Sequence, residues 1–329
     1  MRINRRVLAA LLAVLAVNGL SGCMREPAEP LTWAFRGEGR RPELPAGLET
    51  RDGVPVLSVY DVSEKRTQNM DIETYVAGVV AGEMKNDWPL EALKAQAILA
   101  RTFVLKFCQD KKSKYGNADI STDVAEAQAY DAGGVNDRVR QAVEETRGQV
   151  MSVDGEYPHA WFHAHSGGMT ELPSVALDFR GEDPSYLRPT VSEESEDAPD
   201  DVKHWKVSFT KAQVAKACAD AGVEVGDVQS VEIAEKGESG RAKTLLVNGK
   251  RVSAPSFRIR IGANRLKSTL LERVETEGDT VTFEGRGFGH GVGMSQWGAY
   301  GMAMRGADAQ AIVARYFPEA EIVGMWQQA

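Results

Sequence analysis

The hydrophobic periodicity of this chain differs between its first and second halves. Apolar residues recur with helical spacing in Asp71–Met84 and Pro89–Cys108, and a third, shorter helix is predicted at Asn136–Gly148. From Gln149 onward, short runs bounded by turn residues are typical of β-strands. Helices that gather early and strands that gather late favour an α+β fold over alternating βαβ units. We therefore expect early helices packed on a strand-rich core.

Several later segments complete this prediction. Helices are also expected at Thr210–Ala221 and Ala307–Tyr316, and the acidic run Ser192–Asp201 is interpreted as a solvated loop. Asp154-Gly155 is a plausible hairpin turn, and Asn248-Gly249 marks another turn. The expected strands are Leu57–Val62, Val150–Val153, Tyr157–His163, Ser230–Ala234, Thr244–Val247, the stretch around Val252, and Thr280–Glu284. They lie within a domain predicted over residues 54–317, whose strand-rich subregion covers about residues 202–275.

The N-terminus is typical of an exported protein. A cationic start precedes the apolar run Val7–Val17, which is too short for a stable membrane span and indicates a signal peptide over residues 1–22. The run ends in Leu20–Cys23, which resembles the bacterial lipobox, so the thiol of Cys23 is expected to carry a lipid that anchors the chain to a membrane. The alternative is an ordinary signal peptide or an uncleaved anchor with an incidental cysteine. Proline-rich residues 23–50 are then expected to form an extended tether.

Composition restricts the remaining possibilities. A hydrophobic content of 43% is that of a globular protein, and a net charge of −8 argues against a nucleic-acid-binding surface. Cys108 and Cys218 are the only cysteines besides Cys23, and either a bridge between them or two buried thiols is compatible with the sequence. No CxxC or HExxH motif occurs, so no local spacing indicates zinc.

One carboxylate lies on a predicted apolar helix face. Glu83 continues the spacing of the stripe formed by Ile72, Tyr75, Val76, Val79 and Val80, at the C-terminal end of the helix. Desolvation and the partial negative charge of the helix terminus both disfavour the ionised form of this carboxylate. A carboxyl that keeps its proton can act as a general acid. The alternative is a structural glutamate neutralised by an arginine, for which Arg101 on the second helix is the obvious partner.

Two glycine-rich segments carry polar and aromatic side chains. They are Trp161–Glu171 (WFHAHSGGMTE) and Gly285–Ala299 (GRGFGHGVGMSQWGA). Neither is a P-loop, because no Gly-Lys-Ser/Thr closes the glycines. Dense glycine lets the backbone approach a ligand closely, and interleaved His, Ser, Gln and Trp offer hydrogen bonds and flat faces that suit a sugar. The alternative is a pair of tight turns with structural histidines.

Several of these segments together resemble one family. The landmarks are Glu73–Met84 (ETYVAGVVAGEM), Trp88–Ala97 (WPLEALKAQA), Ala100–Thr102, Phe162–Glu171, Phe257-Arg258 and Gly287–Ala299. In this order they resemble the stage II sporulation protein D / LytB (SpoIID/LytB) family, over roughly residues 54–317. The enzymatic members of that family are lytic transglycosylases of peptidoglycan, and their catalytic glutamate falls on Glu83.

The resemblance also implies a substrate cleft and no cofactor. The further cleft residues that it implies are Arg101, His163, Ser166, His290, Ser295 and Gln296. Some relatives hold zinc through cysteines near a Gln-Xaa-Tyr. This chain has Ser121 and Ala127 in that region, beside Gln128-Ala129-Tyr130, so no metal is expected. His163 and His165 are expected on one strand face without an evident carboxylate partner, so they and His159 are not interpreted as a metal site.

A lytic transglycosylase can work with one carboxylate, whereas a hydrolytic glycosidase usually needs two. The expected reaction cleaves the bond between N-acetylmuramic acid and N-acetylglucosamine and leaves a 1,6-anhydro end. The alternative function is a glycan-binding enhancer of a cell-wall amidase, as LytB-type relatives are described. Expected partners are therefore peptidoglycan strands, a membrane through the lipid, and an amidase, in the periplasm or at the outer face of the cytoplasmic membrane. Whether the role is specific to sporulation depends on the organism.

Overall fold

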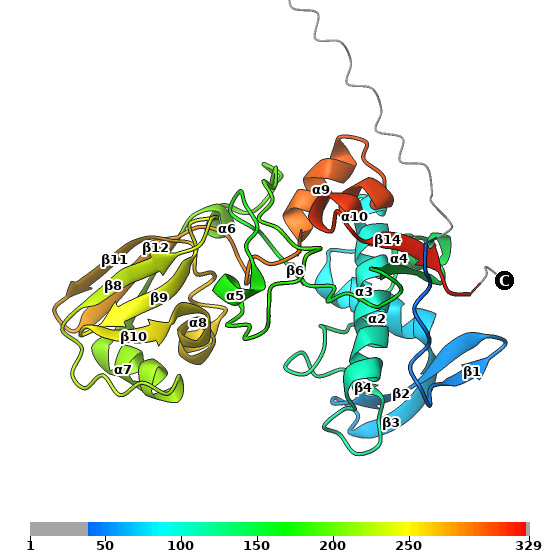
Figure 1. Ribbon diagram of the computed structural model, residues 1–329, viewed down its shortest axis with the longest axis horizontal. Helices are drawn as coiled ribbons and strands as arrows, with labels where there is room; N and C mark the ends of the chain where they lie inside the picture. Colours follow the sequence, from blue (N-terminus) through cyan, green and yellow to red (C-terminus); the bar gives the residue numbers. More distant parts are fainter. Residues whose placement is uncertain (1–38, 327–329) are drawn as a thin grey trace, which may run out of the picture. The chain divides into compact units, whose positions relative to one another are not determined.

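The computed structural model describes residues 39–326, and its architecture is α+β, as the sequence predicts (Figure 1). The signal segment and Cys23 lie outside the described residues. Within the predicted tether, however, Pro42 and Pro45 are buried and the carbonyl of Arg40 accepts a hydrogen bond from Ser152. Residues 40–45 are therefore held against the body of the protein and are not a free tether.

Buried apolar residues form two separate clusters. The helical core contains residues between Leu57 and Val202 and between Val292 and Trp326. Its helices are α2 (Ile72–Glu83), α3 (Leu90–Asp110), α4 (Asp137–Glu145), α9 (Gln296–Met304) and α10 (Ala309–Tyr316). The 3-10 helix η1 (Ala132–Gly134) and the short helices α5 (Pro173–Ala176) and α6 (Asp200–Lys203) lie in connecting segments. In Figure 1, α3 runs beside α2 through this part of the molecule.

Strands flank these helices. β1 (Glu49–Arg51), β2 (Val54–Asp61) and β3 (Arg66–Asp71) form an antiparallel sheet, in which β4 (Ile120–Ser121) adds to β2 in parallel. Two further pairs join distant segments: β5 (Gln149–Ser152) with β14 (Glu321–Gly324), and β6 (Phe162–His163) with β13 (Met294–Ser295).

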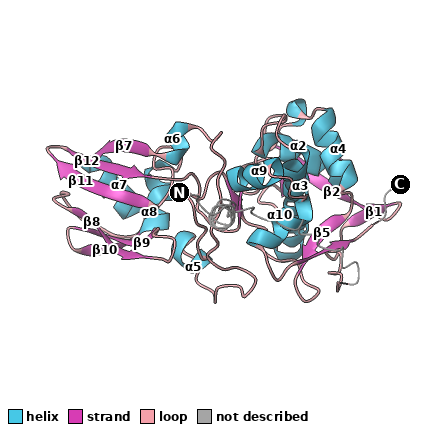
Figure 2. Ribbon diagram, turned by 90° about the horizontal axis from the view of Figure 1, so that it is seen from above, coloured by secondary structure: helices cyan, strands magenta, loops and turns pink. Residues whose placement is uncertain are grey.

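The strand-rich core contains buried residues between Trp205 and Phe283. One sheet consists of β8 (Val231–Lys236), β9 (Ala242–Val247) and β10 (Lys250–Ser253), and the other of β7 (Trp205–Thr210), β11 (Leu271–Glu277) and β12 (Thr280–Gly285). The helices α7 (Lys211–Asp220) and α8 (Ala254–Gly262) pack on each other beside these strands (Figure 2). Thr210 starts α7 with a capping box completed by Gln213.

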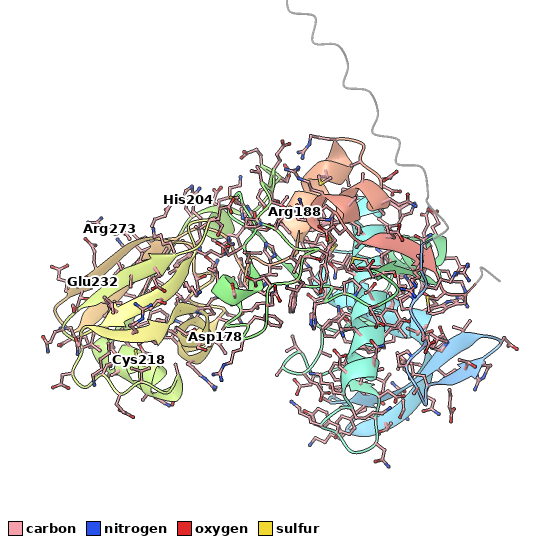
Figure 3. The ribbon with its side chains drawn as sticks, in the orientation of Figure 1. Asp178, Arg188, His204, Cys218, Glu232 and Arg273 are labelled. Atoms are coloured by element: carbon pink, nitrogen blue, oxygen red, sulfur yellow. The ribbon has the colours of Figure 1, made fainter. Side chains whose placement is uncertain are left out.

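The two buried cysteines belong to different cores. Cys108 lies in the helical core and Cys218, on α7, in the strand-rich core (Figure 3). Both are free thiols, so the interpretation as small buried side chains is confirmed and the bridge is wrong.

Local signals locate α2 well. The side chain of Asp71 accepts a hydrogen bond from the Thr74 N–H at 3.0 Å, which satisfies one of the unpaired donors of the first turn. The five residues of the predicted stripe, Ile72, Tyr75, Val76, Val79 and Val80, are all fully buried. The helix ends at Glu83, and Met84 is extended. The buried stripe is therefore confirmed, but Glu73, Gly78 and Ala81 are buried as well and only Thr74 of this helix is exposed, so α2 is a core helix and not an amphipathic one.

The predicted hairpin around Asp154-Gly155 is only half correct. The turn forms, with positive φ at both residues, but it closes a single bridge between Val153 and Glu156. Most of the predicted strand Tyr157–His163 is absent, because β5 and β6 find their partners in distant segments. Asn248-Gly249 also has positive φ at both residues and joins β9 to β10 as expected.

Among the helices of residues 39–326, none combines the length and the apolar character that a membrane-spanning helix needs.

Candidate functional site

Glu83 is the last residue of α2 and is partly buried. Its Oε1 accepts a hydrogen bond from the Ala129 N–H at 2.7 Å, and its backbone carbonyl accepts one from Nε2 of Gln296 at 3.2 Å. Burial raises the pKa of the Glu83 carboxyl; the hydrogen bond from the Ala129 N–H and the nearby Gln296 side-chain amide oppose this by favouring the ionised form. The carboxyl can thus both donate a proton and be stabilised once it has lost it.

Two glycines bring the Ala129 N–H to the end of α2. A Cβ at position 82 would lie 2.7 Å from the Ala129 carbonyl carbon and the Tyr130 nitrogen, and a Cβ at position 78 would overlap the Tyr130 ring. The carbonyl of Gly78 also accepts the Asp131 N–H at 2.9 Å. Because Gly78 and Gly82 are four residues apart, they lie on the same face of the helix. Neither has a side chain, so the loop of residues 129–131 can pack directly against the helix backbone. The sequence shows the spacing of these two glycines, but it does not show that residues 129–131 pack against them.

Arg101 does not contact Glu83. Its Nη2 lies 2.6 Å from Oε2 of Glu73, and the two side chains are 0% and 6% exposed. Glu73 also accepts hydrogen bonds from the Gly148 N–H and from Nε1 of Trp326, both at 3.0 Å. Glu73 and Glu83 are ten residues apart, roughly 15 Å along a helix axis. The interpretation of Glu83 as the ion-pair partner of Arg101 is therefore wrong, and Arg101 itself is fully buried, away from any solvent-facing surface.

Glu194 joins the two glycine-rich segments. Its Oε1 accepts hydrogen bonds from the Ser166 hydroxyl and, at 3.0 Å, from the Ser166 N–H, while Oε2 accepts the Ser295 hydroxyl at 2.9 Å. Nε2 of His165 lies 3.9 Å from the same carboxylate. The Glu194 side chain is only 9% exposed, so the prediction of a wholly solvated acidic run is wrong at this residue. A local charge count could not reveal this, because the carboxylate is desolvated by partners more than 25 residues away.

His163 and His290 lie beside each other, with ring centroids 5.6 Å apart. Nδ1 of His163 donates to the Val292 carbonyl at 3.1 Å, and Nδ1 of His290 accepts the Val292 N–H at 3.0 Å. Burial is the main cause that lowers both pKa values, to about 3 for His290, with the Arg258 and Arg241 charges adding to it there. Both rings are therefore neutral near pH 7, and Nε2 of His163 is a buried atom with no partner among the described residues.

Arg241 supports the same region from the strand-rich core. It is fully buried, and its guanidinium donates to the Ser166 carbonyl at 2.6 Å and to the Met169 carbonyl at 2.9 Å. Gly291, with a φ of +88°, leaves the space that the guanidinium occupies. Sequence analysis did not identify Arg241, since it lies in an ordinary strand-rich stretch without a motif.

The fold thus brings five of the predicted residues into one region. The parallel pairing of His163 with Ser295 aligns the two glycine-rich segments, and Ser295 caps α9, whose first residue is Gln296. Ser166 joins through Glu194, and His290 through its position beside His163. Gln296 connects this group to Glu83.

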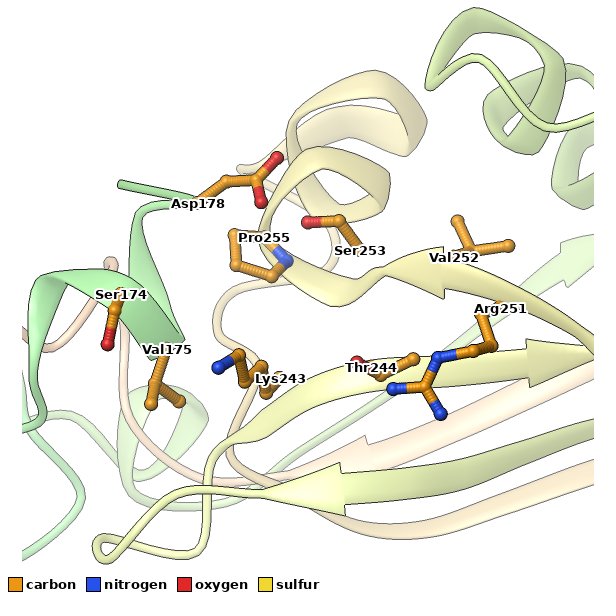
Figure 4. A pocket seen from close by; sticks show the side chains of 9 residues that line it. All are labelled: Ser174, Val175, Asp178, Lys243, Thr244, Arg251, Val252, Ser253 and Pro255. Carbon is orange, nitrogen blue, oxygen red and sulfur yellow. The ribbon is translucent and has the colours of Figure 1, made fainter. Parts of the chain in front are cut away.

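Two cavities, of about 240 Å³ and about 440 Å³, lie away from Glu83. The smaller one lies between α5, β9, β10 and the start of α8, and Figure 4 shows Asp178, Lys243 and Arg251 around it. Two of these charges already have partners, since Asp178 accepts the Ser256 hydroxyl and Arg251 pairs with Glu235. Within residues 39–326, no three His, Cys, Asp or Glu side chains form a group that could hold a metal ion.

Comparisons with known proteins show which family this chain resembles. Residues 60–152 match the family model of the stage II sporulation protein, and residues 177–293 match a domain of unknown function. The chain is 31% identical to stage II sporulation protein D of Bacillus subtilis over 292 residues, covering 84% of this chain and 81% of that protein. It is 30% identical to an uncharacterised protein of Brachyspira hyodysenteriae (84% and 76% covered) and 27% identical to an amidase enhancer of Bacillus subtilis (73% and 39% covered). On this identity and coverage, the chain belongs to the stage II sporulation protein D family.

Proposed function

We propose that this protein is a lytic transglycosylase that cleaves the glycan strands of peptidoglycan, with Glu83 as its acid and base. The observation that carries the proposal is the environment of Glu83. Its carboxyl is partly buried, its pKa is raised by burial, and none of the ion pairs among the described residues includes it. Arg101, which the sequence suggested as a partner for Glu83, forms its ion pair with Glu73 instead. A carboxyl whose pKa is raised keeps its proton to a higher pH than an ordinary glutamate, as a general acid needs.

The reaction needs two proton transfers at one carboxyl. Glu83 protonates the glycosidic oxygen between N-acetylmuramic acid and N-acetylglucosamine, and the bond to the anomeric carbon breaks. The resulting carboxylate, which accepts the Ala129 N–H, then takes the proton from the muramoyl C6 hydroxyl as that oxygen bonds to the anomeric carbon. The products are a 1,6-anhydromuramoyl end and a free N-acetylglucosamine hydroxyl. Because the nucleophile belongs to the substrate, its attack has a large effective concentration.

The region around Glu83 supplies neutral polar groups suited to a sugar. We propose that His290, the least buried of the predicted residues here, contacts the sugar, and that the buried side chains of His163, Ser166, Ser295 and Gln296 position it. The two histidines are uncharged near pH 7, and Glu194 holds both serine hydroxyls in position. Hydroxyl and acetamido groups are recognised by such directional partners, whereas a strongly charged surface would favour ionic ligands.

The second candidate is a glycan-binding protein that stimulates an amidase. It is favoured by the 27% identity to the Bacillus subtilis amidase enhancer. Such a protein would grip the strand with the same polar groups but would not need a protonated Glu83. Incubation of purified glycan strands with the protein alone separates the two functions. Mass spectrometry should find 1,6-anhydromuramoyl ends, and their complete absence at every pH tested would leave the enhancer as the better account.

Export and anchoring through Cys23 remain part of the proposal. They rest on residues 1–23 of the sequence, outside the described part of the structure. A lipid on Cys23 would hold the domain at a membrane facing the cell wall, and thus close to its proposed substrate.

A further inference from the structure

The larger of the two cavities has a volume of about 440 Å³, which lies in the range of sites that bind small organic ligands, about 300–1,000 Å³. It lies between the segment that leads into β6 and the connection that follows α5. Tyr157, His159, Phe179 and Tyr186 contribute its aromatic lining, and Lys106 of α3 its cation. Asp154 and Glu156, both exposed, also line it.

The aromatic wall is rigid. The His159 ring stacks on Trp161, with centroids 4.5 Å apart and planes 14° from parallel. Phe179 meets both rings edge-on, at 6.2 Å from His159 and 5.8 Å from Trp161. The hydroxyl of Tyr186 accepts the His159 N–H at 2.9 Å, which fixes the backbone beneath the wall. A ligand therefore meets preformed flat faces and need not order them.

The polar groups around the cavity suit a ligand that carries hydroxyl groups, because the carboxylates of Asp154 and Glu156 can accept hydrogen bonds from them. Lys106 is already paired with Asp110 at 2.9 Å. Burial, with a smaller effect of the Lys106 charge, lowers the pKa of His159, so this ring is neutral near pH 7. The Tyr157 hydroxyl is buried and has no hydrogen-bond partner among the described residues. A buried hydroxyl without a partner is uncommon in folded proteins, but this oxygen is itself inaccessible, so it is not counted among the groups that a ligand contacts directly. Flat aromatic faces combined with carboxylate acceptors match a pyranose ring and its hydroxyl groups.

The cavity is connected to the candidate site by a short segment. His159 precedes His163 by four residues, so their Cα atoms are at most about 14 Å apart. His163 in turn pairs with Ser295, next to the Gln296 that contacts Glu83. A strand that occupies both sites must therefore be an oligosaccharide of several rings, which extends from Glu83 past this segment to the cavity.

We propose that this cavity is a distal subsite that binds one N-acetylhexosamine ring of the same glycan strand that Glu83 cleaves. The inference rests on the proposed function for its substrate class. It adds one prediction to the proposed function: the affinity for the glycan depends on side chains of the segments 157–161 and 179–186.

The test measures binding without cleavage. The full chain carrying Glu83→Gln is titrated by calorimetry with a glycan octasaccharide that lacks stem peptides. Phe179→Ala removes one aromatic face, and Ser185→Trp fills the cavity from an exposed position without removing a core side chain. Ile259→Ala, which truncates a side chain that is 62% exposed on α8, is the matched control.

Both cavity variants should weaken octasaccharide binding by about three- to tenfold, the range expected for losing one aromatic contact, while the control keeps the parental affinity. Parental affinity in Ser185→Trp, with parental melting, would overturn the proposal. So would loss of binding of a free stem peptide, but not of the naked glycan, since the cavity would then be a peptide site. Weakened octasaccharide binding in both variants supports the subsite even if the unsubstituted chain releases no anhydro product, so the two proposals fail separately.

Discussion

The guanidinium of Arg101 and the carboxylate of Glu73 form a buried ion pair with an N···O distance of 2.6 Å. Both partners belong to segments that carry the family resemblance, and Glu73 lies on the same helix as Glu83. The pairing separates two roles that the sequence left open. Glu73 neutralises the arginine and stabilises the junction with Gly148 and Trp326, and Glu83 keeps a carboxyl without a cationic partner.

Glu83→Gln should leave a folded protein that binds glycan but releases no 1,6-anhydromuramoyl product. The amide is nearly isosteric and keeps a group that can accept the Ala129 N–H, but it cannot donate or take up the reacting proton. General acid–base assistance is worth about 10²–10⁴-fold in rate, so an endpoint assay should show the loss. Glu232→Gln, at an exposed position on β8, is the control and should retain parental activity. A Glu83→Gln protein that still makes anhydro product would exclude this residue as the acid.

The pH dependence of stability should differ between the parent and Glu83→Gln. Burial raises the pKa of this carboxyl in the folded state, so its stabilising effect is complete below the ordinary glutamate pKa and is lost as pH rises through the raised value. The glutamine variant does not ionise and should therefore gain melting temperature relative to the parent across that window. Thermal melts in a pH series measure the difference. A constant difference over the whole series contradicts the raised pKa.

The rate of glycan cleavage should also depend on the ionisation of Glu83. Because the acid must be protonated, glycan cleavage at low substrate concentration should fall as pH rises through the raised pKa of Glu83. The descending limb should therefore lie above the pH at which an ordinary glutamate ionises. It should move to lower pH in any variant that exposes the carboxyl to water.

Glu73→Gln should destabilise the protein by about 3–5 kcal/mol, because it leaves the Arg101 charge buried without a counter-charge. Chemical denaturation followed by circular dichroism measures this change. Glu319→Gln is the matched control, since it breaks the Arg188–Glu319 pair, whose side chains are 58% and 44% exposed (Figure 3). That change should cost at most about 1 kcal/mol. Equal effects of the two substitutions would contradict a structural role for the buried pair.

Gly82→Ala should impair catalysis through the loop that it displaces. The added Cβ would lie 2.7 Å from the Ala129 carbonyl carbon, so the loop must shift and the Ala129 N–H leaves Glu83. Losing a hydrogen bond to a carboxylate costs about 1.5–3 kcal/mol, which corresponds to a rate loss of about ten- to a hundredfold if the bond forms fully with the ionised product. Gly324→Ala, where a Cβ meets open space, is the control. Parental rates in Gly82→Ala would show that this hydrogen bond does not assist the reaction.

Cys23→Ala should yield a precursor that is not lipidated. The prediction rests on the cationic start, the short apolar run and Leu20–Cys23. Metabolic labelling with palmitate, followed by fractionation, measures it. Equal labelling of the variant and the parent would refute lipidation at this residue and leave export as a separate question.

Local signals predict the helices of this protein better than its short strands. The Asp71 cap and the apolar stripe locate α2, and Thr210 with Gln213 locates the start of α7, because these interactions form within a few residues of each other. The segments around β5 and β6 were assigned to one hairpin, but β5 pairs with β14 and β6 with β13. Strand pairing joins residues that are distant in the chain, and neither strand carries a signal that names its partner.

The same distinction applies to the candidate site. The sequence by itself determined that a carboxylate ends an apolar helix stripe and that two glycine-rich segments carry histidine, serine and glutamine, since these are matters of spacing and residue type. Only the tertiary structure decided that Arg101 belongs to Glu73, that Glu194 leaves a polar loop to bind Ser166 and Ser295, and that Arg241 holds the Ser166 loop from the other core. Each of these contacts depends on desolvation by residues far apart in the chain. The sequence shows which side chains are charged, but tertiary packing determines which group lies close enough to neutralise each charge.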